Sequence, residues 1–299
     1  MKIKYTVFCG ILAIALMSIV QPVAAKDKDS LTFAIIQTEE MSVLGQRWDP
    51  TLKYISEKIG LDINFYATTS YASVVQAMLS GFVDIGKLGP KIYLVANDKS
   101  GGDIIPVVAT GRPPNVFYPD PCACYFGTLA TRKGSGLNTI ESVKGKVLAL
   151  VDPGSTSGNA LPRALFPDHI GGKKLEDYFG RVFYSGSHSA SVRAVHSGKA
   201  DAGFISESTF ARVIESGEVK KEDFNFLWRS PQVPLDVIAV NKKTMSDELV
   251  NKVRDAFAHM GKSEEGKALL KATGYFAYVL SDDSKFDPLR KILASKKAK

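Results

Sequence analysis

Along residues 31–111, apolar runs typical of β-strands alternate with segments whose hydrophobic residues recur at the spacing of an α-helix. The apolar runs include LTFAII (31–36) and INFYA (63–67), and Leu52, Ile55 and Ile59 recur at helical spacing between residues 48 and 59. In SYASVVQAMLSG (70–81), Ser70 is suited to begin a helix and Gly81 to end it. VDIGKLGP (83–90) and IIPVVAT (104–110) continue the pattern as strands. This alternation predicts an α/β lobe with a mainly parallel sheet covered on both faces.

The same pattern restarts after the loop GRPPNVFYPDPC (111–122). We expect strands at 125–131, 147–151, 181–185, 200–205, 224–230 and 237–240, and helices at 138–146, 188–198, 206–216 and 246–260. Two α/β units predict two lobes, made of residues 26–128 with 236–299, and of residues 129–235. Two crossover strands would join them, near Gly127–Thr131 and Val233–Val240. A ligand site between the lobes would collect loops from the carboxyl ends of strands on both sides.

The N-terminal 25 residues have the three parts of a signal peptide. Lys2 and Lys4 precede the apolar run FCGILAIALMSIV, and Val23-Ala24-Ala25 forms a small-residue cleavage site. The apolar run is shorter than the roughly 20 residues that a spanning helix needs. We therefore expect an exported, periplasmic protein. The formal charge of +7 is spread along the chain without a long basic run, so nucleic-acid binding is not predicted.

The turn DPGSTSGNALP (152–162) follows a strand-like run and precedes a helix. The first N–H groups of a helix lack acceptors and carry partial positive charge, so an oxyanion fits there, with serine and threonine hydroxyls as further donors. Gly154 and Gly158 would let the backbone approach a ligand. The pattern alone leaves open whether the turn binds an anion or only caps the helix. It places threonine at the centre of a would-be nucleophile elbow, so an enzyme is not predicted.

Five segments in the same order resemble one family. They are ATTSYASVVQAM (67–78), DIGKLGP (84–90), the hydroxyl turn, SGSHSASVRAVHSGKADAG (185–203) and SPQVPLD (230–236). The chain resembles the periplasmic phosphonate-binding proteins of ABC transporters, within the broader phosphate, phosphite and phosphonate-binding group. The resemblance implies a type II periplasmic binding fold whose lobes close on a ligand. It also implies an ABC permease as partner, a monomer, and no cofactor or metal.

The resemblance also implies the residues of the site. Ser155, Thr156 and Ser157 would hold the phosphonate oxygens, and the other implied contacts are Tyr71, Tyr125, His188, Glu207 and Asp236. A dianion prefers N–H and O–H donors and a histidine cation. Carboxylates near an anion are unfavourable unless a positive charge lies between them. Glu207 and Asp236 therefore favour a ligand with an ammonium group, such as 2-aminoethylphosphonate. As simpler roles, Glu207 could cap the following helix and Asp236 a turn.

The sequence CAC (122–124) departs from the family pattern. An oxidising compartment permits a disulfide between Cys122 and Cys124, although so short a ring would stabilise little. A free thiolate at Cys124 would instead be a soft ligand. The wider superfamily includes arsenite-binding sensors that act with a membrane histidine kinase. A sensor that binds arsenite through Cys124, or one that binds phosphite, is therefore the alternative to a transporter component.

Overall fold

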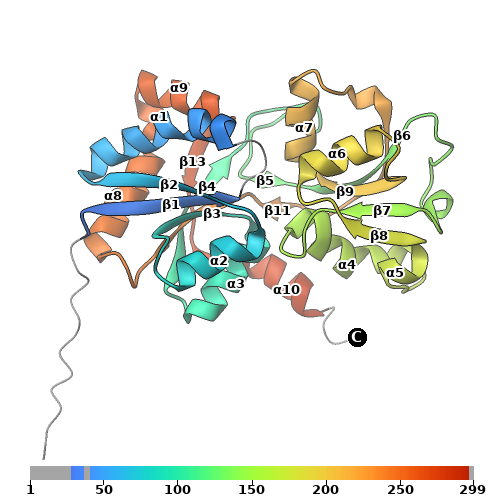
Figure 1. The fold of residues 1–299 in the computed structure, drawn as a ribbon, viewed down its shortest axis with the longest axis horizontal. Coiled ribbons are helices and arrows are strands. Elements are labelled where there is room, and N and C mark those ends of the chain that lie inside the picture. The colour runs from blue at the N-terminus through green and yellow to red at the C-terminus, as the bar shows by residue number, and fades with distance from the viewer. Residues whose placement is uncertain (1–27, 37–40, 296–299) are drawn as a thin grey trace, which may run out of the picture.

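The structure of the protein, a computed structural model, describes residues 28–36 and 41–295. The predicted signal peptide, residues 1–25, lies outside the described residues. Figure 1 shows two lobes side by side, each built on one sheet with helices on both of its faces. None of the described helices is both long enough and apolar enough to cross a membrane.

The first lobe contains a six-stranded sheet in the order β13-β4-β12-β3-β1-β2. Strand β1 pairs in parallel with β2 and β3, whereas β12 lies antiparallel between β3 and β4. Strands β1 to β4 therefore all run in one direction, and their carboxyl ends lie at one edge. The bounds are β1 (Ser30–Ile36), β2 (Asp62–Thr68), β3 (Ile85–Leu88), β4 (Ile104–Gly111), β12 (Val237–Asn241) and β13 (Ala277–Leu280).

Two apolar clusters cover this sheet. Helices α1, α8 and α9 contribute Trp48, Phe257 and Leu270 to one cluster, and α2, α3 and α10 contribute Met78 and Tyr93, among others, to the second. The bounds are α1 (Met41–Ile59), α2 (Tyr71–Leu79), α3 (Pro90–Ser100), α8 (Asp247–Ala258), α9 (Glu264–Thr273) and α10 (Asp287–Ser295). The side chain of Ser70 caps α2 as predicted, by accepting a hydrogen bond from the Ser73 N–H at 3.2 Å.

The second lobe contains a five-stranded sheet in the order β10-β6-β9-β7-β8. Strand β7 pairs in parallel with β8 and β9, while β6 lies antiparallel between β9 and β10. The bounds are β6 (Gly127–Arg132), β7 (Val147–Leu150), β8 (Arg181–Tyr184), β9 (Ala202–Ser206), β10 (Phe224–Arg229), α4 (Leu161–Leu165), α5 (Leu175–Tyr178), α6 (His188–His196) and α7 (Glu207–Glu215). The helix expected at 138–146 is only a 3-10 turn, Glu141–Val143, because Gly145 follows it with a φ of 72°.

Two short strands pass between the lobes, β5 (Cys124–Tyr125) and β11 (Val233–Pro234), and they pair antiparallel. The second crossing overlaps the expected range. The first was expected at Gly127–Thr131, but those residues form β6 inside the second sheet, because they pair with both β9 and β10. The proposed lobe boundary after residue 128 falls within β6, which belongs wholly to the second sheet, and the boundary after residue 235 falls just before β12.

Candidate functional site

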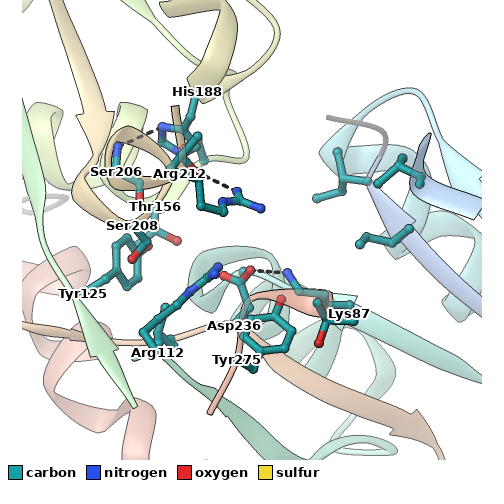
Figure 2. Close-up of a pocket in the computed structure, with 18 of the residues that line it drawn as sticks. Lys87, Arg112, Tyr125, Thr156, His188, Ser206, Ser208, Arg212, Asp236 and Tyr275 are labelled. Atoms are coloured by element: carbon teal, nitrogen blue, oxygen red, sulfur yellow. Dashed lines mark hydrogen bonds and ion pairs between the residues drawn. The ribbon is translucent and has the colours of Figure 1, made fainter. Parts of the chain in front are cut away.

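A cavity lies between the lobes, at the carboxyl ends of the parallel strands of both sheets. Tyr71 follows β2 and Gly89 follows β3, while Ser155 follows β7 and His188 follows β8. Figure 2 shows side chains from both lobes converging on this space. Six residues predicted from the sequence line the cavity, namely Tyr71, Tyr125, Ser155, Thr156, His188 and Asp236. The topology therefore brings together residues that are up to 165 positions apart in the chain.

The hydroxyl turn both caps a helix and lines the cavity. Ser155 has extended backbone angles, and its Oγ accepts a hydrogen bond from the Gly158 N–H at 3.1 Å. A π-helical turn, Thr156–Ala160, then leads directly into α4. The sequence left open whether the turn binds an anion or only caps the helix. The two roles are compatible, because the Ser155 side chain caps the helix and the turn faces the cavity. The first N–H groups of such a turn carry partial positive charge.

The two glycines of this turn are required by packing. A Cβ on Gly158 would overlap the Val151 side chain, and a Cβ on Gly154 would overlap Tyr71 of the other lobe. We had expected both glycines to let the backbone approach a ligand. Gly154 instead lets the turn approach the opposite lobe.

His188 is held as a neutral hydrogen-bond donor. Its Nδ1 accepts a hydrogen bond from the Ser206 N–H at 3.0 Å, which leaves the proton on Nε2. Nε2 lies 3.3 Å from Ser155 Oγ. Burial lowers the pKa of His188 to about 4, against a smaller raising effect of Asp236. The histidine cation expected from the sequence is therefore absent at neutral pH, and His188 presents an N–H instead.

Neutral His188 makes the stability of the protein sensitive to acid. Its folded pKa of about 4 lies below the ordinary value of 6.5, so the unfolded chain binds more protons between these pH values. Stability is then lost as pH falls through that window. We expect His188→Gln to remove about 3 kcal/mol of the decrease in unfolding free energy between pH 7 and pH 4. Urea unfolding of both proteins at several pH values measures this, and parallel pH profiles would contradict it.

Two tyrosines offer further hydroxyl donors. Tyr71 is the first residue of α2, and Tyr125 lies in β5 between the lobes. Burial, with the Asp236 carboxylate as the next cause, raises the pKa of both phenols above the ordinary value of 10. Both phenols therefore stay protonated and can donate to an oxyanion.

Asp236 lines the cavity, but its charge is matched within the protein. Its carboxylate forms an ion pair with Lys87 of β3. Burial acts to raise the pKa of Asp236, yet Lys87 holds it below the ordinary value. Burial acts to lower the pKa of Lys87, and Asp236 raises it overall. Both groups are therefore charged at neutral pH.

Glu207 does not line the cavity, contrary to its predicted role. It is the first residue of α7, and its side chain is buried. Both carboxylate oxygens bind the Arg229 guanidinium, at 2.9 Å from Nε and 2.7 Å from Nη2. The fork geometry of arginine turns this carboxylate toward β10. The capping role is also wrong, since Ser206 holds the N-cap position.

Two further predicted residues lie apart from the cavity lining. Cys124 forms a disulfide with Cys122, so it has no free thiolate for a soft ligand. Ser157 is buried and packs against Gly127. A Cβ added at Gly127 would come within 2.9 Å of the Ser157 Cβ. Ser157 Oγ has no hydrogen-bond partner among the described residues.

Sequence reasoning missed the basic and aromatic side chains of the cavity. Lys87, Arg112, Arg212 and Tyr275 all line it. Lys87 lies in the DIGKLGP segment, which belongs to the family resemblance. Its sequence neighbours, however, do not indicate that its side chain lines a cavity. The local sequence around Arg112 and Arg212 does not distinguish them from surface arginines.

The lobes contact each other across the cavity. The Lys91 N–H, near the start of α3, donates to Thr156 Oγ1 at 3.0 Å. The Lys91 ammonium also binds the Pro153 carbonyl oxygen. Both contacts join the hydroxyl turn of the second lobe to α3 of the first.

Two α/β lobes, two crossing strands and a polar cavity between the lobes define a type II periplasmic binding protein. The comparisons with known proteins agree. Residues 33–286 match the family described as "ABC transporter, phosphonate, periplasmic substrate-binding protein". The chain belongs to this family, which confirms the resemblance seen in the sequence.

Two curated proteins and one crystal structure illustrate the similarity. The phosphonates-binding periplasmic protein of Escherichia coli (strain K12) is 27% identical over 287 residues, 93% of this chain and 80% of that protein. The phosphate-import protein PhnD of Mycolicibacterium smegmatis is 28% identical over 240 residues, 77% of this chain and 71% of that protein. A binding protein component of an ABC phosphonate transporter from Pseudomonas aeruginosa superposes with a TM-score of 0.79 at 25% identity, covering 91% of this chain and 87% of that one.

Proposed function

We propose that this protein captures a small phosphonate in the periplasm and delivers it to an ABC permease. The observation that carries the proposal is that several neutral hydrogen-bond donors line one cavity. Ser155 and Thr156 of the hydroxyl turn, His188, Tyr71 and Tyr125 all belong to the lining, and Ser155 Oγ lies 3.3 Å from His188 Nε2. Donors of this kind match the tetrahedral oxygens of a phosphonate group.

Each donor has a role in this proposal. Ser155 and Thr156 donate hydroxyl hydrogen bonds and His188 donates its N–H. Tyr71 donates from the start of α2 in the first lobe, and Tyr125 donates from the crossing strand β5. The protein acts by binding, as a monomer, without a cofactor. Closing the lobes removes water from the ligand, which strengthens hydrogen bonds to its charged oxygens.

The finer assignment to 2-aminoethylphosphonate rested on two carboxylates. Glu207 binds Arg229 and Asp236 binds Lys87, so each already has a cation. An ammonium group that approached Asp236 would be repelled by the positive charge of Lys87. For the arsenite-sensor alternative, the disulfide at Cys124 removes the thiolate on which it depended. Of the two carboxylates only Asp236 lines the cavity, and Cys124 has no free thiolate, so the proposal is a phosphonate importer without an ammonium-binding site.

Calorimetry and thermal unfolding with methylphosphonate, phosphite and phosphate test this proposal. A ligand at a hundred times its dissociation constant stabilises the folded state by about 2.7 kcal/mol, and we expect methylphosphonate to reach this effect. Potassium chloride at the same ionic strength serves as control and should not. If none of these phosphorus oxyanions raises the unfolding temperature above the chloride control, the proposed function is wrong.

A further inference from the structure

The cavity contains a second group of basic side chains beyond the donors for a phosphonate head. Arg112 follows β4 of the first lobe, and Arg212 lies in α7 of the second. We call these two residues the arginine pair. Figure 2 shows both guanidinium groups in the space between the lobes, with that of Arg112 beside Asp236. Both also help to lower the pKa of Asp236, which places them within electrostatic reach of its carboxylate.

Arg112 is fixed in place from its outer side. The residue is 6% exposed, its Nη1 donates to the Gly274 carbonyl oxygen at 3.3 Å, and its guanidinium carbon lies 4.8 Å from the centre of the Tyr275 ring. Its Nε has no hydrogen-bond partner among the described residues. A buried guanidinium with unused donors is costly unless an anion approaches it.

No carboxylate among the described residues forms an ion pair with Arg112. Asp236 is the one carboxylate among the described residues that line the cavity, and Lys87 forms an ion pair with it. Glu207 lies outside the cavity lining and binds Arg229. His188 and the two tyrosines are neutral and add no negative charge. Among the described residues that line the cavity, basic side chains therefore outnumber carboxylates, which favours an anion.

A phosphonate head at the hydroxyl turn leaves the far side of the cavity to the rest of the ligand. The turn and His188 belong to the second lobe, whereas Arg112 and Tyr275 belong to the first. A ligand that reaches both lobes would place its phosphonate on one side and its tail near Arg112. The planar fork of arginine matches a carboxylate by two parallel hydrogen bonds.

We propose that the ligand is a phosphonate that carries a carboxylate on a short chain, and that the arginine pair binds this carboxylate. This inference rests on the proposed function, since it assigns the tail of the same ligand. It makes Arg112 and Arg212 the residues that determine specificity, and it predicts discrimination against an ammonium tail.

Three phosphonates of similar size test the inference on the purified wild-type protein by calorimetry. Ethylphosphonate has an uncharged tail, 2-aminoethylphosphonate a cationic tail, and phosphonoacetate an anionic tail. We expect phosphonoacetate to bind at least about tenfold more tightly than ethylphosphonate, and 2-aminoethylphosphonate to bind more weakly than both. Equal affinities, or a preference for the ammonium tail, overturn the inference but leave the proposed function intact. Failure of all three to bind contradicts the proposed function itself.

Variants test whether Arg112 and Arg212 cause the preference for phosphonoacetate over ethylphosphonate. We expect Arg112→Gln and Arg212→Gln each to reduce the ratio of phosphonoacetate to ethylphosphonate affinity toward one. The Arg212→Gln variant is included because Arg212 is less buried than Arg112, so its replacement disturbs folding less. Arg193→Gln is the matched control, since it removes a guanidinium that pairs with Glu218 on the surface. An unchanged ratio in Arg212→Gln and Arg112→Gln, or an equal fall in Arg193→Gln, overturns the assignment to the arginine pair.

Discussion

Replacing Lys87 with methionine is expected to lower the free energy of unfolding by about 2–3 kcal/mol at pH 7. Methionine fills much of the same space but removes the ion-pair partner of the Asp236 carboxylate. Breaking a fully buried ion pair costs about 3–5 kcal/mol. The side chain of Asp236 is 28% exposed toward the cavity, so water relieves part of that cost. Urea unfolding monitored by tryptophan fluorescence measures the difference.

The pH dependence and a double variant distinguish this cause from a packing defect. Without Lys87, the folded-state pKa of Asp236 rises, so protonation relieves the defect and the gap to wild type narrows between pH 7 and pH 4. Adding Asp236→Asn removes the unpaired charge and should restore most of the lost stability. A double variant no more stable than Lys87→Met, with a gap independent of pH, would attribute the loss to packing.

Ser155→Ala is expected to weaken methylphosphonate binding by about 10–100-fold. A hydrogen bond to a charged group contributes about 1.5–3 kcal/mol, and the hydroxyl faces the proposed head group beside His188. The same substitution removes the cap on the Gly158 N–H, so we also expect a loss of about 1 kcal/mol in stability. Calorimetry gives the first quantity and urea unfolding the second.

Ser246→Ala separates the two effects. Ser246 caps α8 in the same manner, with its Oγ accepting from the Leu249 N–H at 3.2 Å, and it lies away from the cavity. This variant should lose similar stability and keep full affinity. If Ser155→Ala binds methylphosphonate as well as Ser246→Ala does, the hydroxyl turn is a helix cap and no more.

The fold was largely predictable because its signals are local. Apolar runs and helical spacing located most strands and helices, and Ser70 marked the start of α2. The predicted sheets were described as mainly parallel, which holds for β1 to β3 and for β7 to β9. The antiparallel pairs come from strands next to the crossings, such as β6 and β12, whose direction depends on the return path of the chain. Local periodicity contains no information about that path.

The cavity was predictable only where its residues lie in local motifs. The hydroxyl turn, Tyr71 after a cap and His188 at a helix start all have sequence neighbours that mark them. The charge pairs do not. Asp236 pairs with Lys87 at a separation of 149 residues, and Glu207 pairs with Arg229 at a separation of 22. The prediction of an ammonium tail assumed that both carboxylates face the ligand, but of the two only Asp236 lines the cavity.

The hydrogen bond between Thr156 Oγ1 and the Lys91 N–H has a consequence for unloading. In the proposed complex, the same threonine hydroxyl accepts from one lobe and donates to the ligand. Two hydrogen bonds that share an oxygen in this way polarise and strengthen each other. Coupling free energies are reciprocal. Opening the lobes therefore weakens ligand binding by the same factor by which the bound ligand favours the closed state. A transporter that pries apart α3 and the hydroxyl turn would thereby release its cargo without touching it.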